Sequence, residues 1–179
     1  MSHSDSPIQF AKPILGFAAF SGTGKTTLLI KLLPILRTHG LKIAMIKHAH
    51  HKFDVDKPGK DSFELRKAGA SPMLISSSRR IAIMIDKEEE TEPDLQDLLS
   101  YINPDKIDLV LIEGFKQWPF PKIELYRPEV GKPLLFPDDK NIIAIAHDGE
   151  LPVAASIPVM NINQPEQIAQ FILQFIQQK

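Results

Sequence analysis

The chain has no cysteine, which excludes disulfides and metal sites built on thiolates. No apolar run approaches the roughly 20 residues that a membrane-spanning helix requires, so we expect no membrane contact. The formal net charge is only -1, and no overall excess of positive charge points to nucleic acid as a partner. Residues 1–7 lack the basic and then apolar layout of a secretion signal. Together these absences favour a cytoplasmic protein.

The composition is ordinary for a globular protein: 43% of the 179 residues are apolar and 24% are charged. A chain of this length is most simply one domain. We expect a flexible N-terminal lead-in at residues 1–12, followed by a single nucleotide-binding domain over residues 13–179.

A glycine-rich turn links an apolar run at residues 14–19 to a helix-patterned run. Its residues are Ser21, Gly22, Thr23, Gly24, Lys25, Thr26 and Thr27. Strand, glycine-rich turn with Lys-Thr, and helix form the order of a phosphate-binding loop, or P-loop. The backbone amides would face the phosphates, Lys25 would reach the β- and γ-phosphates, and the Thr26 hydroxyl would hold Mg²⁺. The first glycine of the pattern is Ala19 here, but the rest is intact, so we predict nucleoside triphosphate binding.

Strand-like and helical runs alternate along the chain. Expected strands cover residues 14–19, 41–47, 72–76, 81–85, 108–114, 122–126, 133–136, 141–146 and 159–162, and expected helices run from residue 26 to the glycine at 40 and over residues 63–69, 94–102 and 166–177. This alternation favours the α/β fold of P-loop NTPases, a mostly parallel central sheet flanked by helices on both faces. The runs 122–126 and 133–136 could form a local hairpin or add strands to a partner's sheet.

A nucleotide-hydrolysing loop needs an acid near its Mg²⁺, usually at the tip of an apolar strand. Glu113 follows Leu109–Ile112, the most apolar run of the chain, and is the best candidate. Asp61, in the long polar segment 48–62, is a second candidate that could contact Mg²⁺ or its water. The same segment holds His48, His50 and His51, for which a solvated or phosphate-facing cluster is favoured over a zinc site.

The usual guanine-binding motif, Asn-Lys-x-Asp, does not occur in the chain. The sequence therefore does not indicate by this motif which base the nucleotide carries. Asp148 follows a predicted strand and could accept hydrogen bonds from a guanine edge, although a surface turn explains it equally well. Nothing places Arg79 or Arg80 near a γ-phosphate. Without an arginine finger, hydrolysis by P-loop GTPases is slow, on the order of 10⁻⁴ to 10⁻² s⁻¹.

Several stretches together resemble the MobB family of molybdopterin-guanine dinucleotide biosynthesis adapter proteins. They are the P-loop at 17–29, the middle segments 46–51, 54–62 and 64–70, and Leu111-Ile112-Glu113-Gly114-Phe115-Lys116. The long middle segment makes the resemblance specific, since the P-loop alone is shared by many families. Related dimeric NTPases often carry a lysine just after the first loop position, where this chain has Phe20.

The resemblance implies a GTP-binding homodimer with weak GTPase activity. It would assist the guanylyltransferase MobA, which attaches GMP to molybdopterin to complete the molybdenum cofactor. By position, Ser21 to Thr27 would bind phosphates, Thr26 and Glu113 would serve Mg²⁺, and Asp61 would be a third metal-shell or water-orienting residue. Lys25, Glu113 and Asp61 would then carry catalysis.

A P-loop small-molecule kinase is the alternative, since the same loop serves phosphoryl transfer to an acceptor. A kinase needs a lid that carries arginines. The sequence offers Arg66, Arg79, Arg80 and Arg127 without a lid pattern.

Overall fold

The computed structural model describes residues 8–49 and 53–178. Its backbone contacts group the chain into two compact units, the first formed by residues up to 48 and from 94 onward and the second by residues 49–93. Of the predicted lead-in, residues 1–7 lie outside the described part, whereas Ile8 and Phe10 pack against the core. Each unit is described by itself.

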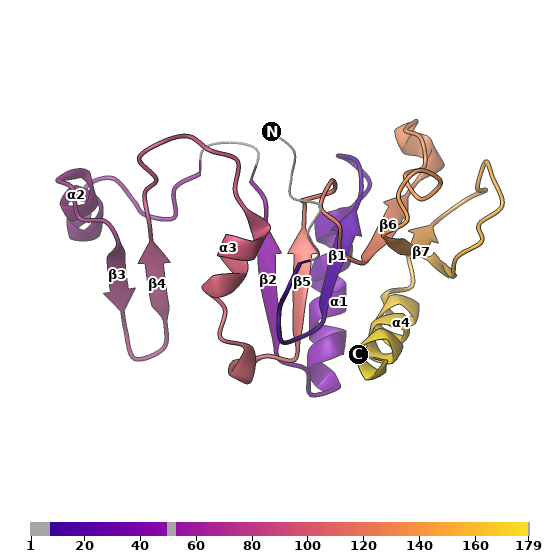
Figure 1. Cartoon of the computed structure of the whole chain (residues 1–179), viewed down its shortest axis with the longest axis horizontal. Helices are drawn as coiled ribbons and strands as arrows, with labels where there is room; N and C mark the ends of the chain where they lie inside the picture. Colours follow the sequence, from indigo (N-terminus) through magenta and orange to yellow (C-terminus); the bar gives the residue numbers. More distant parts are fainter. Residues whose placement is uncertain (1–7, 50–52, 179) are drawn as a thin grey trace. The chain divides into compact units, whose positions relative to one another are not determined.

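The first unit is built on a six-stranded sheet whose neighbouring strands all run parallel (Figure 1). The strand order is β2-β5-β1-β6-β7-β8. In chain order the strands are β1 (Ile14–Ala18), β2 (Ile43–Lys47), β5 (Leu109–Glu113), β6 (Lys122–Tyr126), β7 (Ile142–His147) and β8 (Val159–Asn161). Because parallel strands end at the same edge, the residues that follow β1, β5 and β6 meet there.

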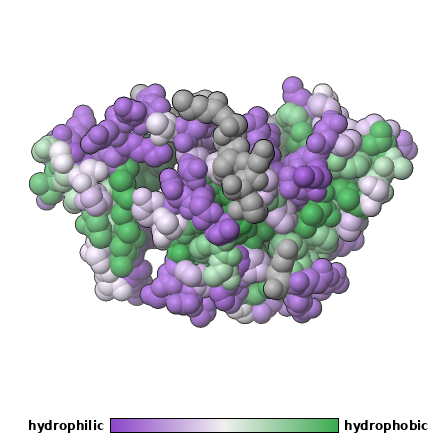
Figure 2. All heavy atoms as spheres, in the orientation of Figure 1, coloured by the Kyte–Doolittle hydropathy of each residue, from purple (hydrophilic) through white to green (hydrophobic). Residues whose placement is uncertain are grey.

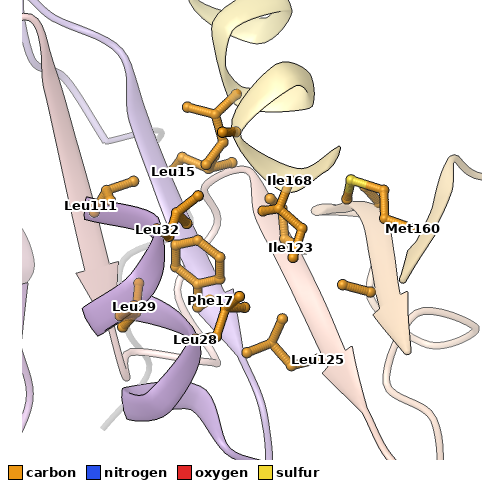
Figure 3. Packing of buried hydrophobic residues seen from close by; sticks show 14 of the residues in the cluster. Leu15, Phe17, Leu28, Leu29, Leu32, Leu111, Ile123, Leu125, Met160 and Ile168 are labelled. Atoms are coloured by element: carbon orange, nitrogen blue, oxygen red, sulfur yellow. The ribbon is translucent and has the colours of Figure 1, made fainter. Parts of the chain in front are cut away.

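Helices cover both faces of this sheet. Successive side chains of a strand point to opposite faces, and apolar strand residues pack against helices on each of them. The helices are α1 (Lys25–Thr38), α3 (Leu95–Ser100) and α4 (Pro165–Gln177), with short 3-10 turns η1 (Pro104–Lys106) and η2 (Pro128–Val130). Leu15 and Phe17 of β1 pack with Leu32 of α1 and Ile168 of α4 on one face (Figure 3). Ile14 packs in a second cluster with residues of α3. The predicted α/β architecture is confirmed.

The prediction for residues 122–136 was wrong in part. β6 lies inside the sheet, between β1 and β7, so it forms no hairpin and has no open edge for a partner. Residues 133–136 form no strand. Instead, the amides of Leu135 and Phe136 each donate to the carboxylate of Glu124 at 2.8 Å. The Glu124 carboxylate of β6 therefore anchors residues 135 and 136 to the sheet by hydrogen bonds.

The second unit contains the helix α2 (Asp61–Lys67) and an antiparallel hairpin of β3 (Met73–Ser76) and β4 (Ile81–Met84). Arg66 joins its ends through ion pairs with Asp54 at 2.7 Å and Asp86 at 3.1 Å. The hairpin and the residue after β4 expose large apolar side chains, seen as green surface in Figure 2. The exposed members are Leu74, Ile75, Ile81, Ile83 and Ile85.

Among the described residues, no helix combines the length and apolar content needed to cross a membrane.

Candidate functional site

The P-loop joins β1 to α1 at the carboxyl edge of the sheet. Gly24 precedes α1 in the left-handed region with φ 89°, which glycine adopts without strain. The carbonyl oxygen of Phe20 accepts hydrogen bonds from the Thr23 hydroxyl at 2.9 Å and from the Thr23 amide at 3.4 Å. No side chain caps the start of α1. The first amides of this 14-residue helix therefore face the space where a phosphate would bind.

The loop residues differ in how accessible they are. Ser21, Gly22, Thr26 and Thr27 are exposed, and Lys25 is partly so, whereas Thr23 is buried. Apart from the Thr23 side chain, which closes the turn, the predicted phosphate-binding groups are thus accessible to a ligand.

Glu113 ends β5, which pairs with β1 on one side and β2 on the other. Its carboxylate lies between two ammonium groups: Oε1 is 3.7 Å from Nζ of Lys25, and Oε2 is 3.8 Å from Nζ of Lys47. The Glu113 side chain is only 12% exposed. The structure therefore brings two of the predicted site residues, Lys25 and Glu113, together. Lys47, at the end of β2, was not predicted.

The backbone after Glu113 turns sharply against His48. Gly114 has φ 99°, and a Cβ at this position would lie 2.6 Å from Cβ of His48. The His48 amide donates to the Glu113 carbonyl at 2.8 Å, and its ring stacks on Phe115 with centroids 4.9 Å apart. His48 therefore packs beside the site. His50 and His51 lie outside the described residues.

Sequence reasoning named Arg127 only among the arginines that lack a lid pattern and did not predict its contact with the P-loop. It follows β6, and its Nε donates to the Thr23 carbonyl of the P-loop at 3.0 Å. Nη1 pairs with Oδ2 of Asp148, and Nη2 donates to Oδ1 of Asn163 at 2.8 Å. Arg127 thus ties the phosphate loop to the segments that follow β7 and β8. The sequence does show that Arg127 directly follows a predicted strand. Only the strand order of the sheet shows that this strand, β6, lies beside β1.

The structure gives the surroundings of two further predicted residues, Asp148 and Asp61. Asp148 accepts from Arg127 and, at 3.4 Å, from Nδ2 of Asn163. Its contact with a base stays a prediction. Asp61 is the exposed first residue of α2 in the second unit, and its contact with Mg²⁺ stays a prediction as well.

The oxygen donors at the loop fit a magnesium ion. Mg²⁺ prefers oxygen ligands and is usually held by one or two carboxylates together with substrate phosphates and water. Glu113 offers a mostly buried carboxylate, and Thr26 offers an exposed hydroxyl. In the part of the chain that the structure describes, no group of three or more His, Asp or Glu could hold a metal by protein ligands alone.

Comparison with known proteins gives consistent matches. The family model described as Molybdopterin guanine dinucleotide synthesis protein B (MobB) matches residues 14–148. The molybdopterin-guanine dinucleotide biosynthesis adapter protein of Escherichia coli strain K12 is 46% identical over 168 residues, covering 93% of this chain and 95% of the relative. The adapter protein of the same name from Haemophilus influenzae is 42% identical over 161 residues, covering 89% and 87%.

The fold agrees with these matches. A crystal structure of molybdopterin-guanine biosynthesis protein B superimposes with a TM-score of 0.67 at 28% identity, covering 90% of this chain and 99% of that one. The family model spans most of the chain, from β1 to the residue after β7. The chain therefore belongs to the MobB family.

Proposed function

We propose that this protein is a GTP-binding accessory protein with weak GTPase activity in molybdenum cofactor biosynthesis. It would assist the guanylyltransferase MobA, which attaches GMP to molybdopterin. One observation carries the nucleotide part: an accessible P-loop whose Lys25 lies 3.7 Å from the strand-end carboxylate of Glu113. The pathway follows from the family and from the relatives' description as adapter proteins of molybdopterin-guanine dinucleotide biosynthesis.

The charges at the loop support the phosphate and metal roles. In the arrangement described above, Lys25 neutralises Glu113. A bound triphosphate would attract Lys25, and the carboxylate of Glu113 would then serve Mg²⁺ together with the Thr26 hydroxyl. Backbone amides of residues 21–27 would hold the phosphates.

Guanine would be read beyond the carboxyl ends of β6 and β7. Asp148 lies there, partly exposed, and its carboxylate already accepts from Arg127. A carboxylate has room for about four hydrogen bonds, so Asp148 could accept from a guanine edge while it keeps its arginine.

The contacts of Arg127 support the proposal of weak hydrolysis. Its guanidinium contacts the loop through the Thr23 carbonyl and donates to Asp148 and Asn163 as well. It is therefore committed to protein acceptors rather than directed at a γ-phosphate. An arginine finger typically contributes 10³–10⁵ in rate, so turnover without one would be slow.

A homodimer would explain the hairpin of the second unit. Leu74 faces Ile83 across the two strands, and both are more than half exposed, as is Ile81. Soluble monomers rarely leave such a row of side chains in contact with water, and an isolated two-stranded hairpin is marginal in water. We propose that a second copy covers this face.

We also propose that the protein is cytoplasmic, because its proposed partner and substrate are those of cofactor assembly.

The decisive experiment for the accessory role is calorimetric titration of the protein into purified guanylyltransferase, with GTP, GDP or no nucleotide and with or without molybdopterin. Contact that depends on GTP would support the role, and absence of contact under every condition would contradict it. A phosphorylated metabolite formed with severalfold stimulation of turnover would instead identify a kinase.

Lys25→Ala is the matched variant for the nucleotide part. It should reduce GTP affinity by about 10- to 100-fold, since a hydrogen bond to a charged group contributes roughly 1.5–3 kcal/mol. The fold should persist, because Lys25 is a partly exposed residue of the loop. Lys31→Ala, an exposed lysine on the same helix, is the control. Unchanged affinity in Lys25→Ala would refute the loop assignment.

A further inference from the structure

Lys116 is a second lysine that faces the P-loop. It lies three residues after Glu113, and its Nζ sits 4.6 Å from the centre of the Phe20 ring. Phe20 is the loop residue that directly follows Ala19. A cation over an aromatic face is attracted to the ring. The contact therefore fixes the ammonium group of Lys116 beside the loop.

Among the described residues, no anion balances the charge of Lys116. Within residues 8–49 and 53–178, no carboxylate lies within ion-pair distance of Lys116, and its Nζ donates no hydrogen bond to the protein. Burial, and then the nearby charge of Lys25, lower the pKa of Lys116. Two ammonium groups thus share this region, and the carboxylate of Glu113 serves Lys25 and Lys47.

The backbone that carries Lys116 is held firmly. The Lys116 carbonyl accepts a hydrogen bond from the buried ammonium of Lys122 at 2.8 Å. The preceding residue, Phe115, has φ 54°, unusual for a residue with a side chain. Its ring is held between His48 and Trp118. Strained backbone that its surroundings enforce is common at ligand sites.

We propose that Lys116 binds the terminal phosphate of the P-loop nucleotide, as a second phosphate-binding lysine beside Lys25. The inference rests on the proposed function, because it needs a nucleotide in the loop. Lys25 has Glu113 as its anion, and a triphosphate would bring the anion that Lys116 lacks among the described residues. The Phe20 ring, within the loop, supports this lysine from the same chain.

The test compares GTP and GDP affinities by calorimetry in Lys116→Met and Lys116→Arg. Lys116→Met should lower GTP affinity about tenfold or more while changing GDP affinity by less than about threefold, since a charge-assisted contact to one phosphate is lost. Lys116→Arg should retain most of the preference for GTP. Lys106→Met, an exposed lysine before the amino end of β5, is the control and should behave as wild type.

Phe20→Leu gives a second measurement. Removing the Phe20 ring should weaken GTP binding by a smaller factor than Lys116→Met does. The double variant Phe20→Leu with Lys116→Met should bind GTP no more weakly than Lys116→Met alone. The thermal midpoints of all variants separate a local effect from unfolding. A GTP-to-GDP affinity ratio that stays unchanged in Lys116→Met would overturn the Lys116 role alone. Absence of any GTP or GDP binding by the wild type would overturn the proposed function and this inference with it.

Discussion

Replacing Lys122 by methionine should destabilise the first unit strongly. The Lys122 side chain is 1% exposed, yet it carries an ammonium group. Its Nζ donates to the carbonyls of Lys116 and Trp118, both at 2.8 Å, and pairs with Asp139 at 2.9 Å. Methionine keeps the length and the apolar stem but offers no donor. Two carbonyls and one carboxylate would then lose the donor that Lys122 supplies, although Asn141 still donates to Asp139 and the Phe120 amide to the Trp118 carbonyl.

The magnitude follows from the burial of the pair. Breaking a buried ion pair by removing one partner typically costs about 3–5 kcal/mol. The Asp139 side chain remains 26% exposed, so water can partly replace Lys122, and we expect the low end, about 3 kcal/mol. For a protein of this size each kcal/mol lowers the melting temperature by roughly 2–4 °C, which gives about 6–12 °C.

Urea unfolding followed by tryptophan fluorescence is a suitable assay. The chain has one tryptophan, Trp118, and its carbonyl is one of the acceptors at stake. Asp139→Asn should also destabilise, and the double variant should be less destabilised than the sum of the two single variants. A loss below about 0.5 kcal/mol in Lys122→Met, within the range of ordinary surface substitutions, would refute the reasoning.

The pair also predicts a pH dependence. Burial opposes ionisation of Asp139, but the hydrogen bonds from Lys122 and Asn141 outweigh it and hold the pKa of Asp139 below its usual value. A carboxyl whose pKa is lower in the folded state stabilises the fold above its unfolded pKa of about 3.9, and this stabilisation is lost as the pH falls through the folded value. The stability gap between wild type and Asp139→Asn should therefore be full at pH 7 and shrink in strong acid.

Three further predictions concern the site. Arg127→Ala frees the Thr23 carbonyl from its arginine and should reduce GTP affinity about 3- to 10-fold without rescue by lysine, whose single ammonium cannot span three acceptors; equal calorimetric affinity would exclude a role in shaping the loop. Gly114→Ala combines a positive φ with a clash against His48 and should lower the free energy of unfolding by about 1–3 kcal/mol or more; urea unfolding that matches wild type would contradict this. Glu113→Gln should reduce Mg²⁺-dependent GTP hydrolysis more than GTP affinity; undiminished phosphate release would shift the role to Asp61.

Local pattern sufficed for the parts of the site that follow one another in the chain. The apolar run into the P-loop, the helix after it and the acid at the end of β5 are each encoded in a short stretch of consecutive residues, the longest being the 14-residue helix. Strand β5 is buried along its whole length, so its apolar run reads as a central strand. The resemblance of the middle segment gave the family.

Strand order could not be read from local pattern, and the contact of Arg127 with the P-loop was not predicted for that reason. It is 104 residues from Thr23 in the chain and meets the loop only because β6 pairs with β1. The strand residues Lys122 and Glu124 alternate with Ile123 and Leu125 and look like a half-exposed strand, yet both charged residues are buried. Their partners, Asp139 and the amides of residues 135 and 136, lie in a segment without a regular pattern of its own.

The central claim is that the P-loop binds guanine nucleotide with Mg²⁺. A titration of labelled GTP in the presence and absence of Mg²⁺, competed with ATP and GDP, tests it most directly. We predict Mg²⁺-dependent binding of GTP that GDP displaces and ATP displaces poorly, with little turnover during the measurement. Displacement by ATP as effective as by GTP, or rapid hydrolysis, would contradict the account.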